Sequence, residues 1–200
     1  MNPHPIIEQL IEIVKNNKLT EKIFVVPSHR DGQLVIQALA RAGQPVLNVK
    51  VKTFMDLALE SIKPIMKKAD YKQMPYQIGK QYIFSELQKL KANKQLSYFN
   101  SVQLTPAFSQ AVYQAILDLK QARVSVQTFP KQAFLKQEKG EDLYRLYHAY
   151  EQKRQENRLL DTADIFELAI QQPVESKKQS LYIFFPHEAY YRIEKDFFLH

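Results

Sequence analysis

Three pairs of residues have the types and the spacing that could bind phosphate groups at the start of a helix. Each pair sets a Ser, Thr or Asp three positions before an aspartate, as in Ser28–Asp31, Thr53–Asp56 and Asp161–Asp164. The first side chain of such a pair accepts hydrogen bonds from the free N–H groups of a helix, and the carboxylate suits the positive end of the helix dipole. Capping of three helices is therefore the simplest interpretation.

A second interpretation of two of these pairs is contact with a nucleic acid. Loops at the carboxyl ends of parallel strands, beside helix amino termini, are where α/β sheets bind phosphates. If the segments before Ser28 and Thr53 are parallel strands, their loops would face a nucleic-acid backbone or base. The candidate DNA-binding residues are Ser28, His29, Arg30, Thr53 and Phe54.

Nucleotide hydrolysis, thiol chemistry and metal binding are disfavoured by what the sequence lacks. A P-loop needs the pattern G-x-x-x-x-G-K-[ST], but the chain has four glycines and none precedes Gly32. The absence of cysteine excludes disulfides, catalytic thiolates and the usual structural zinc sites. The five histidines are scattered, without the spacing of metal ligands. We therefore expect no catalytic residue, no metal and no cofactor in this chain.

Two weaker enzymatic patterns remain. The triplet Glu175-Ser176-Lys177 matches the E-x-K half of a restriction-type nuclease motif, but that chemistry needs a second acidic residue on a neighbouring strand. Because the triplet follows Pro173 in a polar connector, an accidental match explains it better. The other alternative is an enzyme site assembled from Ser28, His29 and Asp164.

The balance of charge is basic. The formal net charge is +7 and the pI is near 9.4. Such a balance suits a nucleic-acid partner, but an ordinary solvated surface explains it equally well, because the lysines are spread along the chain. No run of about eighteen apolar residues is present, and the amino terminus lacks the layout of a signal peptide. We therefore expect a cytoplasmic protein that does not enter a membrane.

Hydrophobic patterns predict a parallel sheet with helices around it. Apolar runs at 23–26 and 46–51 indicate strands separated by a helix over about 30–42, and this order makes a βαβ unit. A further apolar run at 180–185 predicts a third strand of the same sheet. Helical periodicity predicts the other elements, which cover residues 5–14, 76–92, 105–122, 141–157 and 188–199.

The pattern changes after Leu59 and divides the chain. We predict a first part of an α/β domain over residues 1–61, a helical insertion over 62–155 and a return to the α/β domain over 156–200. The last helical pattern stops before its period is complete, so we expect the chain to be a fragment of a longer protein.

With these segments in place, the chain resembles the amino-terminal, helicase-like region of AddB/RexB-type proteins. These are the B subunits of helicase–nucleases, related to UvrD-like superfamily 1 helicases. The segments KIFVVPSHRDG (22–32) and VKVKTFMDLALESI (49–62) are similar to a motif strand with its loop and to the strand and helix that follow. LTPAFSQAVYQAILDLKQARVSVQTF (104–129) resembles the helical insert. The most specific similarity is LYRLYHAYEQKRQENRLLDTADIFELAI (143–170), which precedes a Walker B strand in that family.

The resemblance implies a RecA-like α/β fold of the P-loop NTPase type, with a large helical insertion and an inactivated ATP site. The resemblance identifies the helix that begins at Pro5 with the one that follows the P-loop, so we expect the strand that carries the P-loop to be missing. At the Walker B position an active ATPase has an Asp-Glu pair that holds Mg²⁺. The residues at that position here are Phe184, Phe185, Pro186 and His187.

The resemblance also implies a function. A degenerate motor domain of this kind would be a non-catalytic scaffold that contacts single-stranded DNA or a duplex end and docks to a motor subunit in DNA repair or recombination. In such families a PD-(D/E)XK nuclease domain lies far downstream. A protein-interaction scaffold without affinity for nucleic acid is the alternative.

Overall fold

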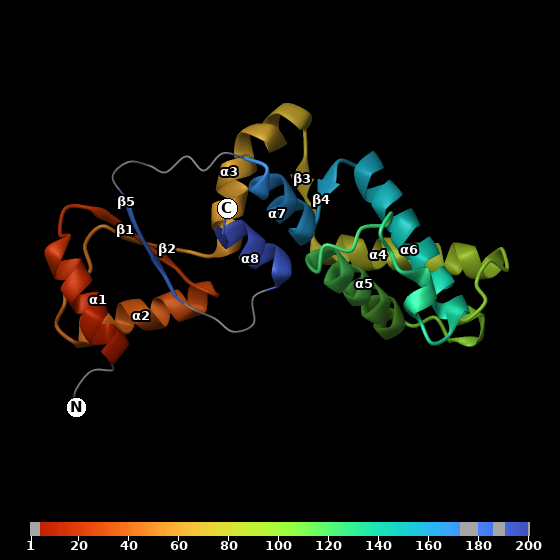
Figure 1. The fold of residues 1–200 in the computed structure, drawn as a ribbon, viewed down its shortest axis with the longest axis horizontal. Coiled ribbons are helices and arrows are strands. Elements are labelled where there is room, and N and C mark those ends of the chain that lie inside the picture. Colours follow the sequence, from red (N-terminus) through yellow and green to blue (C-terminus); the bar gives the residue numbers. More distant parts are fainter. Residues whose placement is uncertain (1–4, 173–179, 186–190, 200) are drawn as a thin grey trace.

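The structure is a computed structural model that describes residues 5–172, 180–185 and 191–199 (Figure 1). It contains a three-stranded parallel sheet in which β1 (Glu21–Val25) lies between β2 (Val49–Lys52) and β5 (Ser180–Phe184). The register sets Phe24 of β1 opposite Val51 of β2 and Ile183 of β5. Segments from the two ends of the sequence therefore meet in one sheet.

Strand β1 is buried on both faces, because its apolar residues alternate between two layers of helices. Ile23 and Val25 pack in the first layer. This layer is formed by α3 (Phe54–Ala69), α7 (Thr162–Ile170) and α8 (Arg192–Leu199).

The second layer covers the opposite face of the sheet. It consists of α1 (Pro5–Asn16) and α2 (His29–Arg41), and its core includes Phe24. Gly32 lets α2 approach the sheet closely, since a Cβ at that position would lie 2.2 Å from Cγ1 of Val51. The sheet is thus enclosed by helices on both sides.

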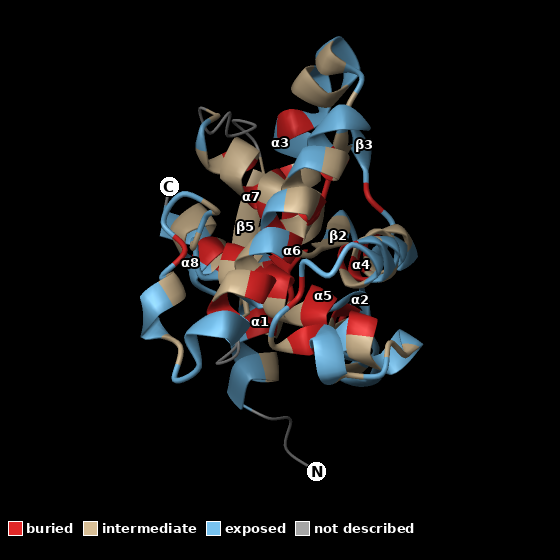
Figure 2. Ribbon diagram, turned by 90° about the vertical axis from the view of Figure 1, so that its right-hand side faces the viewer, coloured by how far each residue is buried: buried red, intermediate tan, exposed pale blue. Residues whose placement is uncertain are grey.

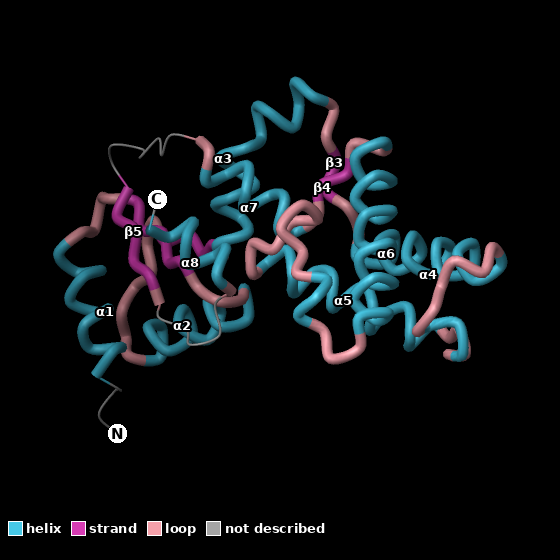
Figure 3. The backbone as a smooth tube through the Cα atoms, turned by 45° about the vertical axis from the view of Figure 1, so that its right-hand side comes forward, coloured by secondary structure: helices cyan, strands magenta, loops and turns pink. Residues whose placement is uncertain are grey.

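Between β2 and β5 lies a helical segment with a core of its own. Its main helices are α4 (Tyr76–Ala92), α5 (Pro106–Gln121) and α6 (Gln137–Glu156). Short 3-10 helices cover 99–101 and 131–133. Strand β3 (Lys72–Gln73) pairs in parallel with β4 (Leu159–Leu160) and ties the ends of the segment together. Figure 3 shows these helices at one end of the molecule, with α3 and α7 between them and the three-stranded sheet.

The core of the helical segment is rich in aromatic rings. Tyr113 of α5 and Tyr150 of α6 are buried, and their ring centroids are 5.6 Å apart. Figure 2 colours the chain by burial and shows buried residues on the inner sides of the helices and exposed residues on their outer turns. The tyrosines therefore serve packing, as their helical spacing indicates.

We expect Gly79→Ala to lower the free energy of unfolding by about 1–3 kcal/mol, because the added methyl group overpacks this core. A Cβ at position 79 would lie 2.2 Å from Cζ of Tyr113, and that ring is held in place by Tyr150. Alanine's higher helix propensity, about 1 kcal/mol, offsets only part of the cost. Urea denaturation of Gly79→Ala, beside the exposed control Ser85→Ala on the same helix, measures the effect. A Gly79→Ala variant as stable as the wild type would contradict the packing argument.

The structure confirms a helix-rich α/β fold with a small parallel sheet, including the return of the third predicted strand to that sheet. The second strand begins at Val49 and not at 46, because Asn48 has a left-handed backbone (φ 54°) that interrupts an extended chain. Helix α3 continues through position 62, the predicted start of the insertion, to Ala69. Within the described ranges, none of the helices has the length and apolarity needed to cross a bilayer.

Candidate functional site

The predicted DNA-binding residues lie beyond the carboxyl ends of β1 and β2, at the N-caps and in the first turns of α2 and α3. Ser28 is the N-cap of α2: its Oγ accepts a hydrogen bond from the N–H of Asp31 (3.2 Å) and donates one to Oδ2 of Asp31 (2.7 Å). The exposed ring of His29 reaches the next helix, with Nε2 3.2 Å from Oδ2 of Asp56. Arg30 is exposed beside it. The two loops are therefore neighbours, joined by the His29–Asp56 contact.

Thr53 caps α3 and forms a full capping box with Asp56. Its Oγ1 accepts from the N–H of Asp56 (3.2 Å), and Oδ2 of Asp56 accepts from the N–H of Thr53 (2.7 Å). A second capping box joins Asp161 to Asp164 at the start of α7. The capping interpretation is confirmed for all three pairs. A phosphate group at α2 or α3 would lie beside the carboxylate of Asp31 or Asp56, and like charges at that distance repel.

Phe54 belongs to the core of the first layer. Its side chain is 6% exposed. The ring centroid lies 6.1 Å from that of Phe184, 6.3 Å from that of Phe197 and 5.9 Å from that of Phe198. A ring packed in this way offers little surface to a base. Of the predicted set, Ser28, His29 and Arg30 are exposed, and Thr53 is half-buried.

The structure describes two of the four residues at the predicted Walker B position, Phe184 and Phe185. Phe184 ends β5 and is 42% exposed, with its ring centroid 4.8 Å from that of Phe198. Phe185 packs against Phe24, with centroids 5.6 Å apart. Pro186 and His187, together with the E-x-K triplet, lie outside the described residues.

A cluster of charged side chains lies where α5, α6 and α7 meet. Nζ of Lys120 lies 2.5 Å from Oε1 of Glu151, 2.6 Å from Oδ2 of Asp161 and 2.9 Å from Oδ1 of Asp164. Arg154 pairs with Glu151 at 2.7 Å and with Asp164 at 3.0 Å. These five residues are named the Lys120 cluster. Side-chain exposure falls to 7% for Lys120 and 2% for Asp161, so the cluster is shielded from water.

Three carboxylates and two cations in this buried space change the proton affinities of the cluster. Burial alone would lower the pKa of Lys120, but the attraction of its carboxylate neighbours raises it above the ordinary value. For Asp161, burial acts to raise the pKa, while Lys120 and a hydrogen bond of 2.7 Å from the hydroxyl of Tyr150 lower it below its ordinary value. Asp164 shifts the other way: burial and repulsion by Asp161 raise its pKa to about 7.

The carboxylates of the Lys120 cluster have the spacing of a metal site. One ligand oxygen from each of Glu151, Asp161 and Asp164 lies within 4.8 Å of the others. The ammonium group of Lys120 lies among these three carboxylates and neutralises them in the place where a metal ion would bind. Arg154 also donates to the carbonyl of Leu159 in β4 (2.8 Å). The arrangement joins the helical segment to α7 and acts as an internal clamp.

The alternative enzyme site is not assembled. His29 pairs with Asp56, whereas Asp164 is held by Lys120 and Arg154. The structure therefore does not bring Ser28, His29 and Asp164 into one constellation.

Sequence reasoning identified the aspartates of α7 as a cap but missed their partners. Glu151 and Arg154 are three residues apart on α6 and so share a face of that helix, which was a usable signal. Lys120 offered none, because it lies 44 residues before Asp164 in the sequence.

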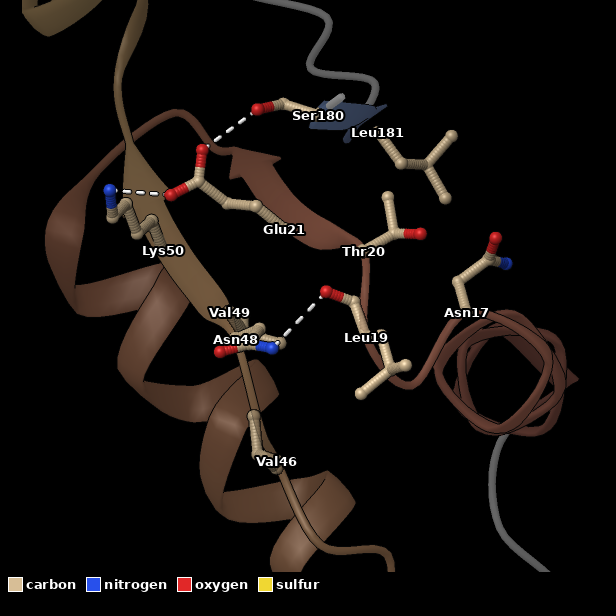
Figure 4. A pocket seen from close by; sticks show the side chains of 10 residues that line it. All are labelled: Asn17, Leu19, Thr20, Glu21, Val46, Asn48, Val49, Lys50, Ser180 and Leu181. Atoms are coloured by element: carbon tan, nitrogen blue, oxygen red, sulfur yellow. Dashed lines mark hydrogen bonds and ion pairs between the residues drawn. The ribbon is translucent and has the colours of Figure 1, made fainter. Parts of the chain in front are cut away.

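An open groove of about 1260 Å³ lies at the amino ends of the three strands, the edge opposite Ser28 and Thr53 (Figure 4). Glu21 of β1 accepts a hydrogen bond from Oγ of Ser180 (2.8 Å) and pairs with Lys50 of β2 (2.5 Å). Nδ2 of Asn48 donates to the carbonyl of Leu19 (3.3 Å). These polar groups bond to one another across the strands, so they hold the sheet together and do not point to a ligand.

The positive charge of the chain is concentrated in one part of it. Residues 71–160 carry 14 Lys and Arg against 7 Asp and Glu, whereas the rest of the chain carries 14 of each. The net charge of +7 therefore belongs to the helical segment with its flanking strands β3 and β4. The excess arises because this stretch holds half of the 28 basic residues but only a third of the 21 acidic ones.

A comparison of the chain with protein-family models and with curated proteins found no match. Any functional conclusion rests on the residues and the geometry described above.

Proposed function

We propose that this chain is a non-catalytic, helicase-like domain with a RecA-type α/β fold, from a helicase–nuclease protein of DNA repair or recombination. Its role is that of a scaffold that contacts DNA. The observation that carries the proposal is the confinement of the whole net charge of +7 to residues 71–160. A basic surface attracts phosphates and supplies most of the affinity in sequence-independent DNA binding.

The capped helices support the non-catalytic part of the proposal. In open α/β sheets, nucleotides bind at the carboxyl edge, where helix amino termini receive the phosphates. Here the first turns of α2 and α3 carry the carboxylates of Asp31 and Asp56, which accept the hydrogen bonds of Ser28 and Thr53. The positive ends of both helices are thus already neutralised by the protein.

The expected result is DNA binding without ATP turnover. Binding of a fluorescently labelled duplex of about 20 base pairs should show a Kd of roughly 10⁻⁴ to 10⁻⁶ M, the range of non-specific binding, and should weaken steeply as salt rises. Fluorescence anisotropy at several salt concentrations measures the binding, and phosphate release measures the turnover. Two outcomes contradict the proposal: no binding at the lowest salt concentration, or magnesium-dependent ATP turnover that co-purifies with the folded protein.

A protein-docking scaffold without affinity for DNA is the second candidate, and one observation favours it. Phe184, Phe198 and Leu199 are exposed apolar side chains, and Phe184 and Phe198 are in ring contact at the carboxyl edge of the sheet. Apolar side chains gathered on a surface are typical of sites that bind another protein, such as a motor subunit. This candidate predicts that DNA binding is absent at every salt concentration.

A further inference from the structure

We infer that the phosphate backbone of duplex DNA lies on one face of the helical segment, built by α4 and α6, and not on the loops after β1 and β2. The inference rests on the proposed function and makes it specific, since it names the surface and the kind of contact. The basic residues of this face, named the α4–α6 face, are Lys72, Lys89, Lys94, Arg145, Lys153 and Arg158.

The two helices run in opposite directions against one another. Near the end of α6, Nζ of Lys153 lies 5.0 Å from the ring centroid of Tyr82, close to the start of α4. Near the start of α6, the carboxylate of Asp142 accepts hydrogen bonds from the N–H groups of Ser97 (3.1 Å) and Phe99 (2.9 Å), beyond the end of α4. Basic side chains from both helices therefore share one surface, about 25 Å long at 1.5 Å per residue of α4.

Both ends of this surface are basic as well. At one end, the N–H of Lys72 donates to the carbonyl of Arg158 (3.0 Å), so that two exposed cations, one in β3 and one in the turn between α6 and β4, are neighbours. At the other end, Arg145 donates to the carbonyl of Gln95, beside the exposed Lys94. Residues far apart in sequence thus continue the positive surface past the ends of the helices.

Several acidic groups of the segment are withdrawn from this surface. Asp142 is fully buried and is satisfied by backbone N–H groups, and Glu151 belongs to the Lys120 cluster. Glu86 is largely covered and pairs with Lys89 at 3.2 Å. The other acidic residues of α4 and α6 are Glu138, Glu141 and Glu156. The exposed balance of the two helices is therefore positive.

The aromatic rings near these cations are already occupied. Lysine ammonium groups lie over Tyr82, over Tyr98 (5.4 Å from Lys136) and over Tyr144 (3.3 Å from Lys131). A ring that stacks on a cation has lost a face that could stack on a base. We therefore expect contact with phosphates alone, which is independent of base sequence.

The test is a charge-neutralised variant with a matched control. The triple variant Lys72→Gln/Lys89→Gln/Lys153→Gln removes three charges from the α4–α6 face. Lys63→Gln/Lys67→Gln/Lys68→Gln removes three from exposed positions on α3 and leaves the same net charge. For duplex DNA, the slope of log K against log salt is expected to become shallower by about 2.7 in the first variant, at about 0.9 per phosphate contact. The control is expected to keep the wild-type slope.

The outcomes separate this inference from the proposed function. Equal weakening in both triple variants means that net charge alone drives binding, and overturns the inference. Wild-type binding in the first variant, with loss of binding in Arg30→Gln, assigns the site to the loops and also overturns it, while the proposed function stands. No binding by the wild type at low salt removes both. Circular dichroism and thermal melting of each variant confirm that changes in binding do not reflect unfolding.

Discussion

Replacing Lys120 with methionine is expected to lower the free energy of unfolding by about 3–5 kcal/mol, the usual cost of removing one partner from a buried ionic group. Methionine fills most of the volume of the lysine but brings no charge. Glu151, Asp161 and Asp164 would then share Arg154 as the remaining cation of the cluster. Asp161 would lose its ion-pair partner at 2.6 Å, and its carboxylate could not be hydrated instead, because its side chain is only 2% exposed.

Urea denaturation at pH 7.5 measures this loss. Lys89→Met is the matched control, because Lys89 is exposed and makes one ion pair, with Glu86, of a kind that contributes little to stability. If Lys120→Met is too unstable to fold, the double variant Lys120→Met/Asp161→Asn should recover part of the stability, since it removes one of the stranded charges. A loss below about 1 kcal/mol for Lys120→Met would show that the cluster is not a clamp.

The second large effect depends on pH. The pKa of Asp164, ordinarily 3.8, is raised to about 7 in the folded protein by burial and by Asp161. Between these values the folded protein binds a proton more tightly than the unfolded chain does. The resulting stability is fully present below pH 3.8 and is lost as the pH rises through 7. We therefore expect the wild type to gain stability on acidification from pH 8 to 5, by up to about 1.4 kcal/mol per pH unit.

The titration of Asp161 limits how far the pH can fall before this gain in stability is reversed. Its pKa is lowered in the folded protein by Lys120 and the hydroxyl of Tyr150, so its contribution is present above its ordinary pKa of 3.8 and is lost at lower pH. The two aspartates therefore oppose one another. Stability should pass through a maximum on the acidic side of neutrality and fall again in strong acid.

Comparison with Asp164→Asn isolates the titration of Asp164, because asparagine keeps the shape of the side chain and carries no proton that titrates. Urea denaturation at pH 5, 6, 7 and 8 should show a shallower pH dependence in this variant than in the wild type. Asp118→Asn is the control, because Asp118 is exposed on α5 and should leave the wild-type slope intact. Parallel profiles for wild type and Asp164→Asn would rule out the raised pKa.

The parts of the fold that depend on neighbouring residues were predictable. The Ser28, Thr53 and Asp161 caps, the start of α5 at Thr105-Pro106 and the parallel βαβ unit all follow from spacings of a few residues. The same local rules misplaced the start of β2, because the apolar run on both sides of Asn48 outweighed the known tendency of asparagine to adopt a left-handed backbone. The ladder of β3 with β4 is two residues long on each side and leaves no periodic pattern.

The candidate sites were harder to predict because they depend on contacts between distant segments. Phe54 follows a strand and begins a helix, as a binding residue would, yet the rings of α8 and β5 enclose it. The Lys120 cluster needs α5, α6 and α7 to converge. The α4–α6 face was hidden for the same reason: its basic residues are far apart in sequence, and two of the acidic residues on α6, Asp142 and Glu151, are withdrawn from the surface by contacts that only the fold determines.

The sheet also sets an order of events during synthesis. Ser180 of β5 bonds to Glu21 of β1 across 159 residues, while β2 lies much nearer to β1 in the sequence. The entropy lost on closing a loop grows with its length, so we expect β1 and β2 to pair before β5 joins them. Until then one edge of β1 is open on the ribosome, and open strand edges are sites of misassembly. When the helical segment folds around its own core, the effective loop between β2 and β5 becomes shorter. We therefore expect β5 to pair sooner and the edge of β1 to be exposed for less time.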